Sequence, residues 1–131
     1  MINKKLLSKS IKNNTGELVV LEEMLEQFVL KRLFFVHADQ KCIRGKHAHI
    51  KCQQILICVR GQITVTFDDG RRKYKRTLKK NSDGILVPNG VWSEQTYKSR
   101  SILLVLCDRK FEEEDYIRDY VKFLKWKNIK E

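Results

Sequence analysis

The sequence predicts an all-β sandwich or barrel that is closed by one C-terminal helix. Two observations support this class: short strand-like runs recur at regular spacing, and the hydrophobic period becomes helical only near the C-terminus. Strands at this spacing favour a sandwich or barrel over alternating βαβ units. With 131 residues, the chain has room for one core, so we predict a single domain over residues 1–131.

Seven runs that are rich in apolar, β-branched and aromatic residues are predicted as strands. In chain order they are Leu18–Leu21, Arg32–His37, Gln54–Arg60, Gln62–Asp68, Tyr74–Leu78, Gly84–Val87 and Ser101–Cys107. Turn signals such as "NNTG" at residues 13–16 separate them. The stretch around Asp69-Gly70 is predicted as a hairpin, with these two residues supplying the positive φ angles of its turn.

The C-terminal stretch "FEEEDYIRDYVKFLKWKN", residues 111–128, is predicted as one amphipathic helix. Ile117, Tyr120, Val121 and Leu124 fall at helical spacing. Acidic residues come first and lysines last, which suits the helix dipole. We expect this helix to pack on the β domain.

Composition restricts the possible partners and compartment. The net charge is +11, but the lysines are scattered and no helix-turn-helix or RNA-binding signature appears, so we predict no nucleic-acid partner. The charge is compatible with a phosphorylated substrate. We find no membrane-length apolar run, signal peptide or paired cysteine motif. We therefore predict a cytoplasmic protein with free thiols and no membrane association.

Two histidines share one face of a predicted strand in "RGKHAHIKCQQILICVRG", residues 44–61. His47 and His49 are separated by one residue, and successive strand side chains alternate between faces. Such a pair can be a structural feature of a core, with both rings hydrogen-bonded to polar neighbours. It can also transfer protons, because neutral imidazole accepts and donates protons near neutral pH. With Gln54 close by and Arg44 at the expected mouth, we favour catalytic roles for His47 and His49.

The spacing from these histidines to Gln54 and Gly61 resembles the first cupin motif, with glutamine in place of glutamate. "GILVPNGVWS" resembles the second motif, with Ser93 in place of the third metal-binding histidine. The resemblance implies a cupin double-stranded β-helix, a jelly-roll barrel. Glutamine is a weak ligand and serine is rarely one, so we predict no functional metal and no cofactor.

Four stretches together resemble the sugar 3,4-ketoisomerases: "RGKHAHIKCQQILICVRG", "VTFDDG", "VPNGVW" and "DYIRDYVKFLKW". These are metal-free cupins that act on dTDP-4-keto-6-deoxyglucose. The resemblance implies isomerisation to a dTDP-3-keto-6-deoxyhexose by proton transfer through an enediolate. It also implies a role in 3-amino sugar synthesis for lipopolysaccharide O-antigen, and a homodimer with exchanged N-terminal strands. The family's tyrosine-rich aromatic pair is Phe34-Phe35 here.

Six residues are predicted to contact the substrate: Arg44, Gln54, Arg32, Trp92, Lys51 and Ser93. Arg44 is the first candidate for the diphosphate, with Arg32 in reserve, because the guanidinium fork suits phosphate. Gln54 could steady a developing oxyanion. Trp92 could stack on the thymine or pack in the core. Two other functions remain open, a non-catalytic cupin that binds an anionic sugar and a sugar-nucleotide 3,5-epimerase.

Overall fold

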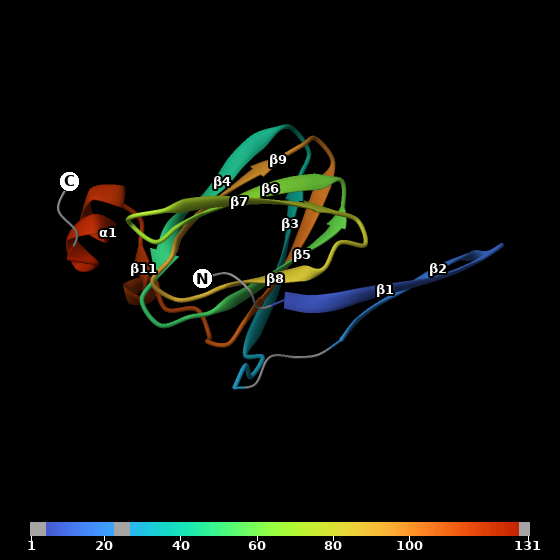
Figure 1. Ribbon diagram of the computed structural model, residues 1–131, viewed down its shortest axis with the longest axis horizontal. Helices are drawn as coiled ribbons and strands as arrows, with labels where there is room; N and C mark the ends of the chain where they lie inside the picture. The colour runs from blue at the N-terminus through green and yellow to red at the C-terminus, as the bar shows by residue number, and fades with distance from the viewer. Residues whose placement is uncertain (1–4, 23–26, 129–131) are drawn as a thin grey trace.

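The computed structural model describes residues 5–22 and 27–128, which form two antiparallel sheets facing each other (Figure 1). The first sheet has the order β2-β1-β8-β5-β10-β3 and the second β11-β4-β9-β6-β7. The first sheet contains β1 (Lys5–Asn13), β2 (Gly16–Glu22), β3 (Arg32–Ala38), β5 (Gln54–Arg60), β8 (Gly84–Val87) and β10 (Ser101–Cys107). The second contains β4 (Cys42–His49), β6 (Gln62–Asp68), β7 (Lys73–Lys79), β9 (Trp92–Tyr97) and β11 (Tyr116–Ile117). The described strands are thus arranged as two open sheets, not as one closed barrel.

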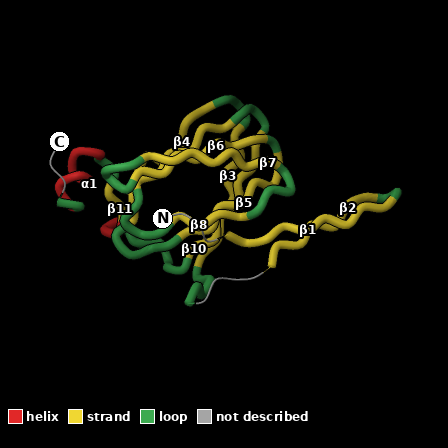
Figure 2. Tube along the Cα trace, in the orientation of Figure 1, coloured by secondary structure: helices red, strands yellow, loops and turns green. Residues whose placement is uncertain are grey.

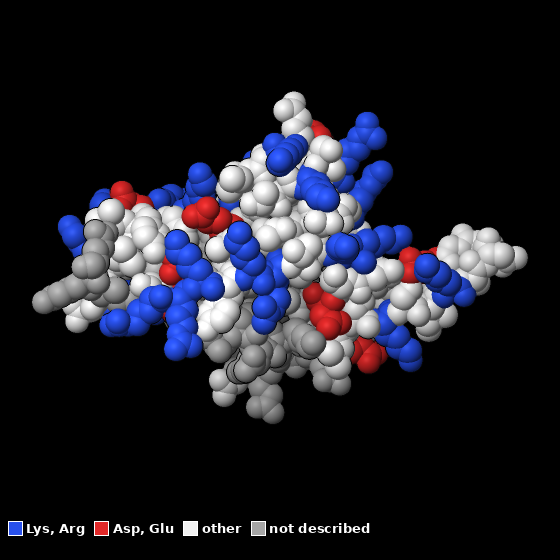
Figure 3. Space-filling model, turned by 45° about the horizontal axis from the view of Figure 1, so that its top comes forward, with Lys and Arg blue, Asp and Glu red and all other residues white. Residues whose placement is uncertain are grey.

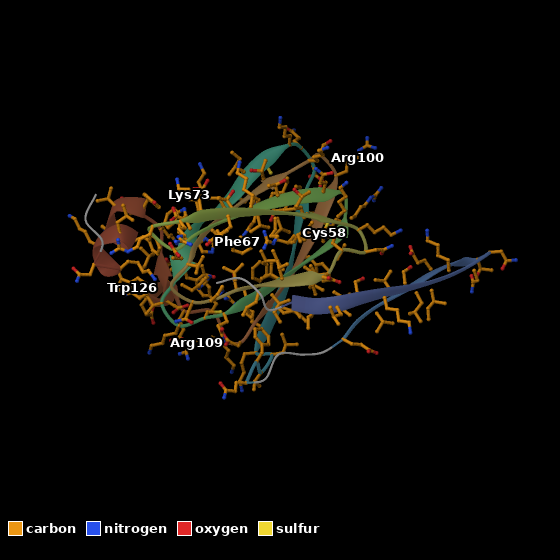
Figure 4. All side chains as sticks on the ribbon, viewed as in Figure 1. Cys58, Phe67, Lys73, Arg100, Arg109 and Trp126 are labelled. Carbon is orange, nitrogen blue, oxygen red and sulfur yellow. The ribbon has the colours of Figure 1, made fainter. Side chains whose placement is uncertain are left out.

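The core lies between the two sheets because their strands alternate inward and outward residues. On β10, Leu103 and Val105 point inward, and on β6 Ile63, Val65 and Phe67 are completely buried. Figure 4 shows Phe67 on the inner side of its sheet. Burial of each large apolar side chain contributes about 1.5–3 kcal/mol to folding. The period-two pattern therefore confirms the predicted all-β class.

Four predicted strands, β5, β6, β8 and β10, have the predicted bounds, and three others are a little longer in the structure. The list of predicted strands lacked β1, β4, β9 and the two-residue β11, although His47 and His49 were placed on a predicted strand. The β6–β7 hairpin is confirmed, but its turn is different. Its loop has four residues, 69–72, and only Gly70 has a positive φ, of 96°. Asp69 instead accepts hydrogen bonds from the backbone N–H groups of Arg71 and Arg72.

The predicted C-terminal helix over residues 111–128 is wrong in its extent. A short 3₁₀ turn, Glu113–Asp115, is followed by β11, and only then does α1 (Tyr120–Trp126) begin. Asp119 ends the extended segment and caps α1 by accepting from the Lys122 N–H. Val121 is 51% exposed, whereas Phe123 is fully buried. Tyr116 and Ile117 pair with β4 instead, so strand pairing overrides the helical spacing at this point.

The two ends of the molecule differ in character. Figure 2 shows β11 beside α1 at one end, and the β1–β2 hairpin extending from the other as an arm. The described arm joins the sheet through two residue pairs, Lys5 with Ile85 and Leu6 with Gly84. On the face in Figure 3, lysines and arginines are spread over the surface with acidic residues among them. α1 is far too short to traverse a bilayer, and the described part of the chain contains no other helix that could.

Candidate active site

A cavity of about 470 Å³ lies between the two sheets. Its apolar wall comes from β3, β4 and β10, with Phe34, Val36, Ile43 and Val105. Its polar groups are His47, Gln54, Gln95 and Tyr116. Three cationic side chains also line it, those of Arg44, Lys46 and Arg118. A concave site of this size with convergent polar groups suits a small anionic ligand.

A bulge in β4 aims His47 into this cavity. The pairing of β4 with β9 shifts between Arg44 and His47, so β4 has one extra residue there. The extra residue is accommodated at Gly45 and Lys46, whose φ angles are 94° and 43°. A Cβ on Gly45 would lie 3.1 Å from Nε2 of Gln95. The backbone angle therefore favours glycine here, and any larger residue would also push the Gln95 side chain aside.

His49 is held by a buried carboxylate. Its Nδ1 lies 2.9 Å from Oδ2 of Asp115, and the two side chains are 5% and 9% exposed. Asp115 Oδ1 accepts from the Lys51 N–H at 2.7 Å, and Oδ2 also accepts from the Cys52 N–H at 3.3 Å. A carboxylate that accepts in this way keeps the imidazole proton on Nδ1. The buried Nε2 of His49 has no hydrogen-bond partner among the described residues, and it carries the basic lone pair.

His47 is held in the same tautomer by the backbone. Its Nδ1 donates to the carbonyl oxygen of Gly45, which leaves the lone pair on Nε2. The rings of His47 and His49 are edge to face, with their centroids 4.9 Å apart. The Tyr116 ring contacts both, at 5.0 Å from His47 and 4.3 Å from His49. Hydrogen bonds and ring contacts therefore hold both imidazoles in place, and Nε2 is the proton-accepting nitrogen of each ring.

Burial keeps both imidazoles neutral. Loss of hydration and, next in size, the neighbouring His49 lower the pKa of His47 to about 4. Burial also lowers the pKa of His49, although the hydrogen bond to Asp115 acts in the opposite direction. At neutral pH the two rings can therefore accept protons.

Tyr116 links the histidines to two arginines. Arg118 lies 4.3 Å from the centre of the Tyr116 ring and makes two hydrogen bonds to Glu113, of 2.9 and 3.0 Å. Nη1 of Arg32 lies 3.3 Å from the Tyr116 hydroxyl oxygen. Arg32 does not line the cavity and instead supports Tyr116.

The structure brings together only part of the predicted site. His47, Arg44 and Gln54 line the cavity, and Nε2 of Gln54 donates to Sγ of Cys107 at 3.4 Å. Four predicted substrate-binding residues, Arg32, Trp92, Lys51 and Ser93, do not line it. Trp92 packs on Tyr120 and Phe123 at 5.3 and 5.7 Å between ring centroids, so it belongs to the core under α1. Ser93 is buried opposite His47, and the exposed Lys51 contributes its backbone N–H to Asp115.

Residues 3–128 match the family described as "FdtA: WxcM-like, C-terminal". The chain belongs to this family. It is 35% identical over 129 residues to TDP-4-oxo-6-deoxy-alpha-D-glucose-3,4-oxoisomerase from Aneurinibacillus thermoaerophilus, covering 96% of this chain and 93% of the relative. The resemblance to the sugar 3,4-ketoisomerases that the motifs predicted is thereby confirmed.

Solved structures of 3,4-ketoisomerases share the fold. A 3,4-ketoisomerase from Helicobacter canadensis is 32% identical, with a TM-score of 0.85 and coverage of 95% of this chain and 96% of that chain. QdtA, a sugar 3,4-ketoisomerase from Thermoanaerobacterium thermosaccharolyticum, was solved with TDP. It is 27% identical to this chain, with a TM-score of 0.84, and the match covers 95% of this chain and 93% of QdtA. A mutant of QdtA was solved with TDP-4-keto-6-deoxyglucose. The predicted cupin-type fold is confirmed.

Sequence reasoning missed five residues of this FdtA-like site: Asp115, Tyr116, Arg118, Gln95 and Lys46. Three of them, Asp115, Tyr116 and Arg118, lie in "DYIR", which was used for the family resemblance and was predicted as part of the helix. Gln95 and Lys46 carried no local signal, because they reach the cavity through strand pairing and the β4 bulge.

Proposed function

We propose that this protein converts dTDP-4-keto-6-deoxyglucose to a dTDP-3-keto-6-deoxyhexose. The observation that carries the proposal is the pair of neutral imidazoles, half-buried His47 and buried His49, beside a cation-lined cavity, each with its proton held on Nδ1. Both can accept a proton without first losing one. The relatives named for 3,4-oxoisomerase or 3,4-ketoisomerase activity support the same reaction.

The reaction requires two proton transfers, one between carbons and one between oxygens. The 4-keto group acidifies the hydrogen on C3, and one imidazole removes that proton to form an enediolate across C3 and C4. The same imidazole then returns the proton to C4. The second imidazole takes the proton of the C3 hydroxyl and delivers it to the C4 oxygen, which leaves the ketone at C3.

The remaining groups of the cavity bind and orient the substrate. Arg44, Lys46 and Arg118 supply positive charge for the diphosphate. Gln54 is buried at the cavity wall, and its amide can hold a sugar oxygen. We place no substrate contact at Trp92, Lys51 or Ser93, and we assign Arg32 to the support of Tyr116.

The decisive experiment is turnover of dTDP-4-keto-6-deoxyglucose in deuterated water, with NMR of the product. We expect a 3-ketosugar nucleotide that carries deuterium at C4, and deuterium exchange at C3 of the remaining 4-ketosugar. A 3,5-epimerase would instead place deuterium at C3 and C5 and keep the ketone at C4. Tight binding of the substrate with no exchange would support the non-catalytic alternative and refute the enzyme.

Substitution of each histidine assigns the two roles. His47→Asn and His49→Asn should each lower the rate by about 10²–10⁴-fold. The variant that lacks the carbon base should show no exchange at C3, whereas the variant that lacks the oxygen shuttle should keep exchange with little product. His37→Asn on β3 is the matched control, because His37 is exposed, whereas His47 lines the cavity and His49 is buried against it. Parental rates in both active-site variants would contradict the mechanism.

The β1–β2 arm supports a homodimer. Leu7, Ile11 and Leu18 on the arm are 42%, 53% and 59% exposed, more than a stable monomer needs to leave in water. We propose that a second copy covers these side chains, with the arms exchanged. Light scattering should give twice the chain mass, and Ile11→Lys together with Leu18→Lys should reduce it to that of one chain.

The product would be consumed by a pyridoxal-phosphate aminotransferase in the synthesis of a 3-amino sugar for surface polysaccharide. This proposal rests on the family, as does the expectation that the reaction takes place in the cytoplasm. Co-incubation with such an aminotransferase and detection of a 3-amino sugar nucleotide would test it.

A further inference from the structure

A buried sulfur completes a cluster of metal-binding groups beside the proposed catalytic pair. His49, Cys52 and Asp115 each offer one ligand atom, and these atoms lie within 4.8 Å of one another. The three residues are 4%, 2% and 8% exposed. His49 and Asp115 take part in the proposed isomerisation, whereas the Cys52 thiol has no role in it.

We propose that these three residues form an inhibitory site for a thiophilic divalent cation, of which Zn²⁺ is the type. An imidazole nitrogen, a thiolate and a carboxylate are the three donor types that Zn²⁺ takes from proteins. The thiolate and the carboxylate together neutralise the two positive charges of the ion. Of the positions that the cupin motifs assign to metal ligands, this cluster uses only His49.

The distances allow such an ion with a small rearrangement. Zn²⁺ bonds of about 2.0–2.3 Å place tetrahedral donors roughly 3.3–3.6 Å apart. Nδ1 of His49 and Oδ2 of Asp115 are already 2.9 Å apart, and the widest separation in the cluster is within 4.8 Å. The ion would have to draw the donor atoms somewhat closer together, and rotation of the Cys52 side chain is one way to do so.

Binding would also displace protons. Sγ of Cys52 donates to the carbonyl oxygen of Gln53 at 3.4 Å, so the thiol carries its proton. An ion that binds this sulfur must therefore release its proton to solvent.

The consequence for activity follows from the tautomer of His49, and it rests on the proposed isomerase mechanism. With the ion on Nδ1, the proton of the neutral ring must lie on Nε2. Nε2 is the nitrogen that has no partner among the described residues and that would accept a proton in catalysis. A bound cation thus converts the acceptor into a donor, and proton transfer through His49 stops.

The test uses Cd²⁺ and Zn²⁺ on the full chain. Cd²⁺ should produce an ultraviolet thiolate-to-metal absorption band and inhibit turnover, and a chelator should restore the activity. Cys52→Ser should weaken Cd²⁺ binding by at least about tenfold and should resist inhibition by Zn²⁺. Cys58→Ser is the matched control, since Cys58 is also buried but lies toward the other end of the sheets, away from β11 (Figure 4).

Three results would overturn the proposal. Cys52→Ser could bind Cd²⁺ as tightly as the parent protein does, or Cys58→Ser could lose the absorption band as completely as Cys52→Ser does. The third is unchanged turnover when the site is saturated with the ion. Circular dichroism checks folding, and Cys52→Ala replaces Cys52→Ser if the serine variant is unstable. The absorption band does not depend on turnover. A protein that binds Cd²⁺ through Cys52 but never isomerises the sugar would therefore support the site and refute only the proposed reaction.

Discussion

Asp115→Asn is the sharpest test of how the site is built, because it changes one buried oxygen to nitrogen. Asp115 accepts three hydrogen bonds, from His49 Nδ1 and from the backbone N–H groups of Lys51 and Cys52. Asparagine has one acceptor oxygen and a donating amide, so it cannot accept all three. We expect the asparagine oxygen to keep the shorter bond, the one of 2.7 Å from the Lys51 N–H. The amide NH₂ then faces His49 and the Cys52 N–H, whose contact of 3.3 Å is the weaker one.

In that orientation His49 must accept on Nδ1, and its proton moves to Nε2. The acceptor nitrogen is lost, so we expect the rate to fall by about 10²–10⁴-fold. That loss corresponds to about 2.7–5.4 kcal/mol of transition-state stabilisation, at about 1.36 kcal/mol for each factor of ten. The Cys52 N–H also loses its acceptor, and an unsatisfied buried donor costs about 1–3 kcal/mol of folding stability.

The assay combines turnover with imidazole ¹⁵N NMR, which reports the nitrogen that carries the proton. We expect a shift of the His49 proton from Nδ1 to Nε2, with little change in dTDP binding. Asp119→Asn is the matched control, because Asp119 caps α1 outside the cavity and asparagine caps a helix equally well. Full activity in Asp115→Asn, or a lower rate with the His49 tautomer unchanged, would refute the positioning role.

Three further predictions concern charge, metal and pH. Arg44→Ala should weaken dTDP binding by about 1–3 kcal/mol. Arg76→Ala, on the exposed outer part of β7, should leave dTDP binding unchanged. Equal dTDP binding in both variants would show that Arg44 does not contact the diphosphate. Treatment with a strong chelator should leave the activity unchanged or raise it, and a loss that one divalent metal restores would contradict a metal-free mechanism. Because burial lowers the pKa of His47 to about 4, the neutral base persists as the pH falls below 6.5, and protonation ends its action only near pH 4. The acidic limb of the kcat/KM profile should therefore lie well below 6.5, and a limb at or above 6.5 would show that the histidines are not desolvated as the structure has them.

The sequence by itself determined the features that depend on neighbours along the chain. Short apolar and β-branched runs between turn signals predicted β5, β6, β8 and β10 with their bounds, because strand propensity and turn residues act locally. The alternation of side chains along a strand placed His47 and His49 on one face, and their rings do contact each other. Gln54 was predicted from its spacing to these histidines, and it lines the cavity with His47.

The tertiary structure alone decided which distant residues meet these side chains. Asp115 lies 66 positions after His49, and the pairing of β11 with β4 brings them together. The helical spacing of Ile117 and Tyr120 concealed that pairing, because a two-residue strand leaves no period of its own. Likewise, only the packing of α1 assigns Trp92 to the core. Local pattern fixes the face on which a side chain lies, but the partner across that face depends on strand order and register, which are set by contacts distant in sequence.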